Sequence, residues 1–259
     1  MQMKSKKPQN KVVLQRYNIV VKANALIQNS RFSLSTQQQK ILMYIISHIE
    51  PYEEEFKTIK FSTVDFCKMC GIETKSDIYE IIKRQIKDIA DKSLWIESEE
   101  GKETLLRWIE KPYINKHSGI IEIKLDDDMK PYLLQLKEKF TEYTLIYTLN
   151  FKSKYSIRLY EYLKSIHYKK LYEYENTIAI DRFMQLLDSP YKNFKDFHTR
   201  VLKAAQKEIN ELSDIIFDYE LHMQGRKATA ITINIQTKDF ADRIKTEAKN
   251  EKILDKKEG

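Results

Sequence analysis

The sequence predicts an α+β protein of two tandem winged-helix domains, because one order of elements occurs twice along its 259 residues. In each half, a helix, a short strand, a short helix and a longer helix precede a β-hairpin. A helix-turn-helix followed by such a hairpin is the winged-helix arrangement. We expect the first domain at residues 1–139, with a basic N-terminal arm, the second at 140–237, and a charged tail at 238–259.

Capping residues and apolar stripes place the elements of the first half. Ser35, with Gln38 three residues later, has the pattern of a capping box, and Gly71 is suited to end a helix. The predicted elements are a helix from Ser35 to about Pro51, a strand at 58–61, a helix from Ser62 to Gly71, a helix from Ser76 or Asp77 to about Asp91, hairpin strands at 94–96 and 105–109, and an extended segment at 120–125.

The segment between the halves begins with Asp126, Asp127 and Asp128 and predicts a helix to about Lys139. Three carboxylates in a row could bind a metal, but their place at a helix start favours stabilisation of the helix dipole.

The second half repeats this order of elements. Its predicted elements are a strand at 144–149, a helix that Ser153 caps, a strand at 174–180, a helix at 181–187, a helix at 193–212, and strands at 215–221 and 230–235. After Thr237 the low apolar content predicts a frayed helix or a disordered tail.

The helix at 193–212 is the best candidate for contacting DNA. Asp196 is the only acidic residue between Lys192 and Lys207, whereas an ordinary surface helix carries charges of both signs. The candidate binding residues are Lys192, Asn193, Lys195, Thr199, Arg200, Lys203 and Lys207. Lysines suit phosphates, while Asn193 and Arg200 have donors for base edges.

Two further segments are weaker candidates. Arg226 and Lys227 form the tip of the second hairpin, where a wing commonly meets the phosphate backbone. In the first half the equivalent helix offers Lys75, Ser76, Lys83 and Arg84. The first hairpin has an acidic tip with Glu97, Glu99 and Glu100, which phosphates would repel. The first domain is therefore expected to read fewer bases, or to contact proteins.

Composition agrees with a basic, folded protein that needs no cofactor. The net charge is +7, which suits a polyanionic partner such as double-stranded DNA. The five glycines are too scattered for a phosphate-binding loop. Cys67 and Cys70 have the spacing of a zinc site but lack two further ligands, so we interpret them as buried thiols. The histidines lack metal-chelating spacings, and we predict no metal site and no catalytic residue.

No apolar run approaches the roughly 20 residues of a membrane span, and no signal-like segment follows the basic start. These features predict a cytosolic protein without a membrane partner. Two alternative functions stay open at this point. One is a winged-helix transcriptional regulator. The other is a DNA nickase or relaxase, which the absence of a metal-binding histidine pair argues against.

Three strings carry a family resemblance: RFSLSTQQQKILMYIISHI, KYSIRLYEYLKSI and YKNFKDFHTRVLKAAQKEINELSDIIFDYELHMQGRKATAITINI. They resemble the iteron-binding plasmid replication initiator (Rep) family over about residues 10–236. The resemblance implies binding of direct repeats at an origin, with the second domain in the major groove. It also implies a homodimer through the first domain that represses its own gene, recruitment of the host initiator and replicative helicase, and origin opening.

Within that resemblance, Lys195, Arg200 and Lys203 match the recognition-helix surface of the family, and Arg226 and Lys227 match its wing. The acidic first hairpin departs from a simple DNA-contacting wing.

Overall fold

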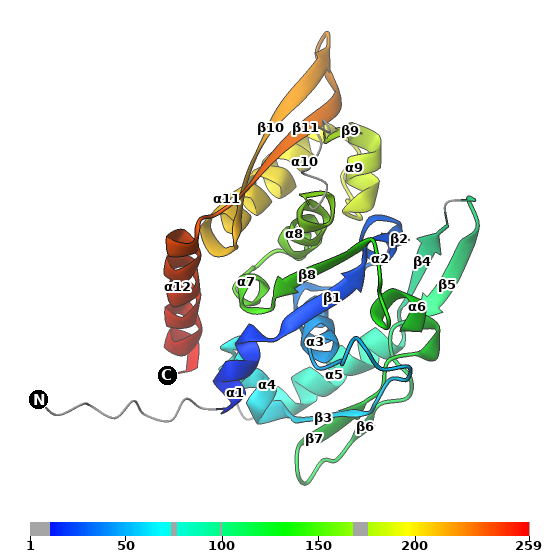
Figure 1. Ribbon diagram of the computed structural model, residues 1–259, viewed down its shortest axis with the longest axis vertical. Coiled ribbons are helices and arrows are strands. Elements are labelled where there is room, and N and C mark those ends of the chain that lie inside the picture. The colour runs from blue at the N-terminus through cyan, green and yellow to red at the C-terminus, as the bar shows by residue number, and fades with distance from the viewer. Residues whose placement is uncertain (1–10, 74–76, 99, 168–175, 259) are drawn as a thin grey trace, which may run out of the picture.

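A computed structural model describes residues 11–73, 77–98, 100–167 and 176–258. Two groups of helices and hairpins stack along the long axis of the molecule, with the hairpin β10–β11 extending at one end (Figure 1). Buried apolar side chains of both groups form one continuous core. Expectations for Lys75 and Ser76, and for the basic arm and strand residues 174–175, concern positions outside the described residues.

The first group contains the short helices and strands that surround the buried helix α3. Its elements are α1 (Lys11–Leu14), η1 (Gln15–Tyr17), β1 (Ile19–Ala23), α2 (Asn24–Gln28), β2 (Ser30–Arg31), α3 (Thr36–Ile46), β3 (Ile59–Ser62), α4 (Thr63–Cys70), α5 (Ile78–Ala90), β4 (Ser93–Glu97), β5 (Glu103–Arg107), β6 (Tyr113–Ile114), β7 (Ile120–Ile123), η2 (Asp127–Met129) and α6 (Lys130–Leu133).

The capping signals at Ser35, Ser62 and Gly71 act as predicted. Ser35 Oγ accepts the backbone N–H of Gln38, and the Gln38 side chain accepts the N–H of Ser35, which completes the capping box of α3. Ser62 Oγ accepts the N–H of Asp65 at the start of α4, and Gly71 ends α4 with a φ of 60°. Asp77 occupies the N-cap position of α5 but makes no side-chain capping bond.

Strand pairing in the first group differs from a simple three-stranded wing. The predicted hairpin exists as β4–β5, but its inner strand pairs with β2. Strand β3, which leads into α4, pairs instead with β7, and β6 completes that sheet. An isolated bridge between Ile109 and Leu125 connects the two sheets.

The connecting segment corrects two expectations. The helix predicted to reach Lys139 ends at Leu133, because the chain turns extended at Leu134 and takes positive φ values at Gln135 and Lys139. The strand predicted at 144–149 lies earlier, as β8 (Phe140–Thr144), and is followed by the buried helix α7 (Ile146–Leu149). β8 pairs with β1 near the start of the chain, a partner that local sequence patterns do not specify.

The second group has the strand order of a simple winged helix. Its elements are α8 (Lys154–His167), β9 (Thr177–Ala179), α9 (Ile180–Leu186), α10 (Phe194–Phe197), the π-helical turn η3 (His198–Leu202), α11 (Lys203–Leu212), β10 (Ile215–Gln224) and β11 (Lys227–Thr237). The strand β11 lies between β10 and β9, so the strand before α9 pairs with the strand that leaves the wing.

Helix α8 joins the two groups through buried polar groups. The Arg158 guanidinium donates to the carbonyls of Ser30 at 2.9 Å and Leu186 at 2.8 Å, and it lies 4.0 Å from the centre of the Phe32 ring. Burial lowers the pKa of Arg158 to about 10, which still leaves it charged at neutral pH. One cation thus ties β2 of the first group to α9 of the second.

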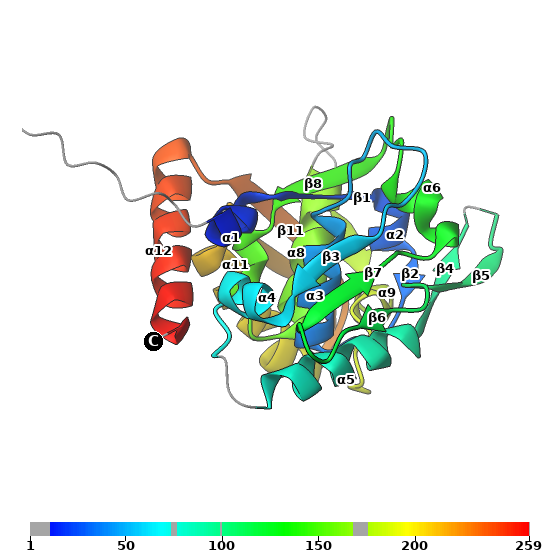
Figure 2. The same ribbon diagram turned by 90° about the horizontal axis from the view of Figure 1, so that it is seen from below.

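The charged tail is a packed helix and not a disordered segment. α12 (Phe240–Glu258) contacts α4, α7 and α11, and both views show it along one side of the molecule (Figures 1 and 2). Leu254 and Asn250 are fully buried in this contact. Few apolar residues are enough to hold α12 in place, because polar side chains make many of its contacts with the rest of the protein.

Candidate nucleic-acid interface

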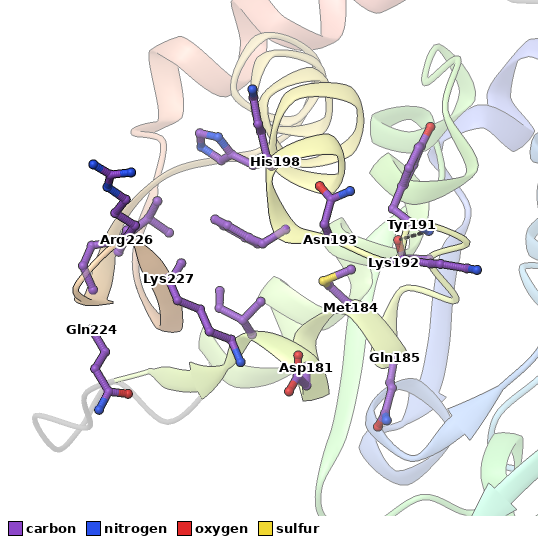
Figure 3. Close-up of a pocket in the computed structure, with 17 residues that line it drawn as sticks. Asp181, Met184, Gln185, Tyr191, Lys192, Asn193, His198, Gln224, Arg226 and Lys227 are labelled. Atoms are coloured by element: carbon purple, nitrogen blue, oxygen red, sulfur yellow. Dashed lines mark hydrogen bonds between the residues drawn. The ribbon is translucent and has the colours of Figure 1, made fainter.

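A groove of about 1080 Å³ lies between α9, the start of α10 and the wing β10–β11 (Figure 3). It brings together five of the predicted binding residues: Lys192, Asn193, Lys195, Arg226 and Lys227. These residues come from two segments separated in the sequence, so folding alone creates this basic groove.

The helix predicted at 193–212 runs without a break as α10, η3 and α11. Its inner face buries the apolar side chains Phe197, Val201, Leu202, Ala205, Ile209 and Leu212. The side chains of Lys192, Lys195, Arg200, Lys203 and Lys207 are all exposed. Among the described residues, none of these five cations has a salt-bridge partner, so their charge is available to an external anion.

Asn193 caps the helix with both ends of its amide. Its Oδ1 accepts the Asp196 N–H at 2.9 Å, and its Nδ2 donates to Asp196 Oδ2 at 2.8 Å. Base reading by Asn193 would require this cap to open, at a cost of about 1 kcal/mol. Lys192 and Lys195, on either side of it, face no such competition.

The wing tip is a tight turn at Gly225, where φ is 61°. Arg226 and Lys227 are exposed on it, and Figure 3 shows them on the wing side of the groove, across from Lys192 and Asn193. An anion in the groove would therefore meet cations from two sides.

The remaining predicted residues that the structure describes lie outside this groove. Thr199, Arg200, Lys203 and Lys207 are exposed along the rest of the same helix. Lys83 and Arg84 are exposed on α5 of the first group, and Lys83 lies 3.7 Å from Glu80. The cationic surface of α5 is thus partly neutralised, in contrast to that of the second helix.

The sequence reading missed His198, which links the helix to the wing. Its Nε2 lies 2.8 Å from the Tyr219 hydroxyl on β10, and its ring stacks on Phe194 with 5.4 Å between the centres. Burial, and then the nearby Lys203 charge, lower the pKa of His198. The spacing of Phe194 and His198, one helical turn apart, was the only local signal for this pair.

The lowered pKa of His198 predicts a loss of stability in acid. The unfolded chain binds a proton near pH 6.5 while folded His198 still resists it, so stability is intact above about pH 6.5 and falls as the pH drops toward the folded pKa. We expect His198→Gln to flatten this decline in urea unfolding between about pH 5 and 8. His48, whose pKa burial also lowers, gives the same sign, and His48→Gln serves as the comparison. An unchanged pH dependence in His198→Gln would contradict the assignment.

The surroundings of the two cysteines and of the aspartate cluster are those of groups that stabilise the fold. Cys67 and Cys70 are buried thiols that are not joined in a disulfide, and burial raises the pKa of Cys67 to about 11. Asp126 Oδ1 accepts the Asp128 N–H at 3.1 Å, and Asp127 forms ion pairs with Lys124 and Lys130. In the described part of the chain, no group of three His, Cys, Asp or Glu side chains is arranged to hold a metal ion. Within the same residues, no helix combines the length and apolar character needed to cross a membrane.

Comparison with known proteins supplies the family. The WH1 domain described as "Initiator Replication protein, WH1" matches residues 19–164, and "Initiator Rep protein, WH2" matches residues 179–235. The chain is 27% identical to a replication initiation protein of Escherichia coli over 259 residues, which covers 91% of this chain and 80% of that protein. It is 22% identical to an uncharacterised 27.6 kDa protein of Escherichia coli, covering 80% of this chain and 92% of the other.

A solved structure has the same fold. The Pi initiator protein, crystallised in complex with iteron DNA, superposes with a TM-score of 0.71 at 20% identity, over 87% of this chain and 99% of that one. The predicted pair of winged-helix domains is therefore confirmed. This chain belongs to the Rep family of replication initiator proteins, with a WH1 domain followed by a WH2 domain.

Proposed function

We propose that this protein binds directly repeated DNA sequences at a replication origin, with the WH2 helix α10–α11 in the major groove and the WH2 wing on the flanking backbone. The observation that carries the proposal is the set of exposed cations on that helix, which have no salt-bridge partner in the described part of the chain and continue across the groove to Arg226 and Lys227. Family membership supports it, as does the iteron DNA bound to the Pi initiator, which has the same fold.

The groups of the interface divide by chemistry. Lys192, Lys195, Arg226 and Lys227 surround the groove and are suited to phosphates, which position a protein on the duplex without reading sequence. Arg200 carries the forked donor set that binds the O6 and N7 acceptors of guanine. Lys203 follows Arg200 on the exposed side and can bind a phosphate beside that base.

Replacement of Arg200 and Lys203 by Ala tests the interface. We expect specific binding to a duplex carrying the repeats beside the gene to be lost. The log–log slope of affinity against salt should become shallower by about one unit for each phosphate contact removed. Fluorescence anisotropy over a salt series, with repeat and scrambled duplexes, measures both quantities.

Lys252→Ala with Lys256→Ala is the matched control. It removes the same charge from exposed positions in the C-terminal half of α12, which lies along one side of the molecule with its C-terminal end pointing away from the wing (Figure 1). The control should bind as wild type does. Unchanged binding in Arg200→Ala/Lys203→Ala, or equal loss in both variants, would refute the assignment of the WH2 helix.

Three further activities are proposed on the strength of Rep family membership. A dimer formed through WH1 represses the gene of the protein, the bound initiator opens the origin, and it recruits the host initiator and replicative helicase. We also propose that the protein does this without catalysis. Supercoiled origin DNA incubated with the protein and magnesium or manganese should remain supercoiled, and relaxed or nicked product would contradict this.

A further inference from the structure

In WH2 the wing is the hairpin whose second strand, β11, pairs with β9, the strand before the short helix α9. β9 leads directly into α9, and its last residue, Ala179, pairs with Ala230 on β11. The wing tip therefore projects beside the N-terminal end of α9, and α9 and the wing form two walls of the basic groove.

In WH1, pairing with the strand before the short helix selects the hairpin β6–β7 as the wing, whereas the order of elements along the chain suggests β4–β5. β3 leads directly into α4, and its last residue, Ser62, pairs with Ile120 on β7. The turn 115–119 between β6 and β7 consequently lies beside the start of α4, where the Thr63 N–H donates to the Gly119 carbonyl at 3.1 Å. The acidic hairpin β4–β5 pairs with β2 and projects from another part of the domain (Figure 1).

The β6–β7 turn also has the chemistry of a wing. From Lys111 to Gly119 the sequence contains Lys111, Lys116 and His117 and no acidic residue. Lys116 and His117 are exposed at the tip, and among the described residues Lys111 and Lys116 have no ion-pair partner. By contrast, the described residues at the tip of β4–β5 include three acidic side chains, Glu97, Glu100 and Glu103.

The turn is held in shape before any ligand arrives. Asn115 Oδ1 accepts the N–H groups of His117 at 3.0 Å and Ser118 at 3.1 Å, and the Gly119 N–H donates to the Asn115 carbonyl at 2.9 Å. At the base of the hairpin the Lys111 ammonium lies 5.6 Å from the centre of the exposed Tyr113 ring. A fixed turn loses little conformational freedom when its lysines bind an anion.

We propose that the β6–β7 turn is the DNA-contacting wing of WH1, with Lys111 and Lys116 binding phosphates of the duplex. This inference rests on the proposed function of the chain as a DNA-binding initiator. In WH1 the turn 115–119 is followed at once by Ile120, which pairs with β3. In WH2 three further residues of β11, Lys227 to Thr229, separate the turn from Ala230, which pairs with β9. The WH1 wing is therefore short, and it contacts the backbone without reaching the bases.

The test compares two pairs of cations in WH1. Lys111→Ala/Lys116→Ala removes the basic turn, and Lys102→Ala/Arg107→Ala removes the same charge from the exposed β4–β5 hairpin. The first variant should flatten the salt dependence of binding to the repeat duplex by about two units, and the control should leave it unchanged. Because phosphates carry no sequence information, binding to repeat and scrambled duplexes should weaken by the same factor.

A second measurement locates the contact. Hydroxyl-radical footprinting should show a shorter protected segment for Lys111→Ala/Lys116→Ala, lost from one end only, with thermal unfolding unchanged. If this variant keeps the wild-type salt slope and footprint while Arg200→Ala/Lys203→Ala loses binding, the WH1 wing assignment is wrong and the proposed function stands. If the wild-type chain shows no preference for the repeats, both are overturned.

Discussion

Replacing Lys22 by Met is expected to lower the free energy of unfolding by about 3–5 kcal/mol, the effect of leaving one member of a buried ion pair without its partner. Lys22 Nζ lies 2.5 Å from Glu161 Oε1, and the two side chains are only 9% and 5% exposed. The pair joins β1 to α8, and the Tyr143 hydroxyl on β8 also donates to Glu161. Without Lys22, the Glu161 carboxylate would keep the Tyr143 hydroxyl donor but lose its ion-pair partner.

A double-mutant cycle isolates this interaction. Glu161→Gln removes the charge while keeping the shape, so Lys22→Met/Glu161→Gln should be markedly more stable than Lys22→Met alone. Urea unfolding of the four proteins, monitored by far-ultraviolet circular dichroism, gives the coupling energy. Additive effects, or a loss below about 1 kcal/mol in Lys22→Met, would show that the pair contributes little to the junction.

Leu254→Ala is expected to destabilise the protein by about 2–5 kcal/mol, as large-to-small changes in a packed core do. Leu254 is fully buried, and a Cβ atom added at Gly71 would lie 2.9 Å from its backbone. Around it, Arg16 forms ion pairs with Glu251 and Asp255 and donates to the Met69 carbonyl at 3.0 Å. α12 is thereby fixed to α4 of WH1.

Lys252→Ala is the matched control for Leu254→Ala, because Lys252 is exposed on the same helix and its change should alter stability by less than about 0.5 kcal/mol. Gly71→Ala offers a second approach to the same contact. It combines a left-handed backbone, at φ 60°, with the close approach to Leu254, so it should also destabilise strongly. Equal stability of Leu254→Ala and Lys252→Ala would contradict the packing of α12.

Both sites show that several independent contacts join the first group of elements to the second group and to α12. Lys22–Glu161 and Arg158 act through α8, while α12 reaches α11 of WH2 as well as α4 of WH1. On α12, Asn250 donates to the Leu212 carbonyl at 2.8 Å and accepts from Asn150. If the WH2 wing and the β6–β7 turn contact one duplex together, these hydrogen bonds and ion pairs set the angle between them.

The sequence by itself determined the local elements and the binding helix. Ser35 and Ser62 begin their helices because a side-chain oxygen satisfies a free backbone N–H, a contact that spans only three residues. The apolar stripe from Phe197 to Leu212 likewise assigned an inner face, which left the cations of the WH2 helix outside. The choice of Arg200 and its neighbours as DNA-binding residues stays a prediction.

Only the tertiary structure decided which strands pair and where the tail packs. Alternation along a strand indicates its buried face but not its hydrogen-bonding partner, so β3 could not be assigned to β7 in preference to β5 from the sequence. β8 was placed too late in the chain, and its partner β1 lies far away in sequence. α12 has too few apolar residues to predict a packed helix, because its anchors are polar groups whose partners are brought to it only by folding. Hydrogen bonds and ion pairs between distant segments leave no periodic signal in the sequence, and these contacts set how the two groups of elements and α12 are arranged.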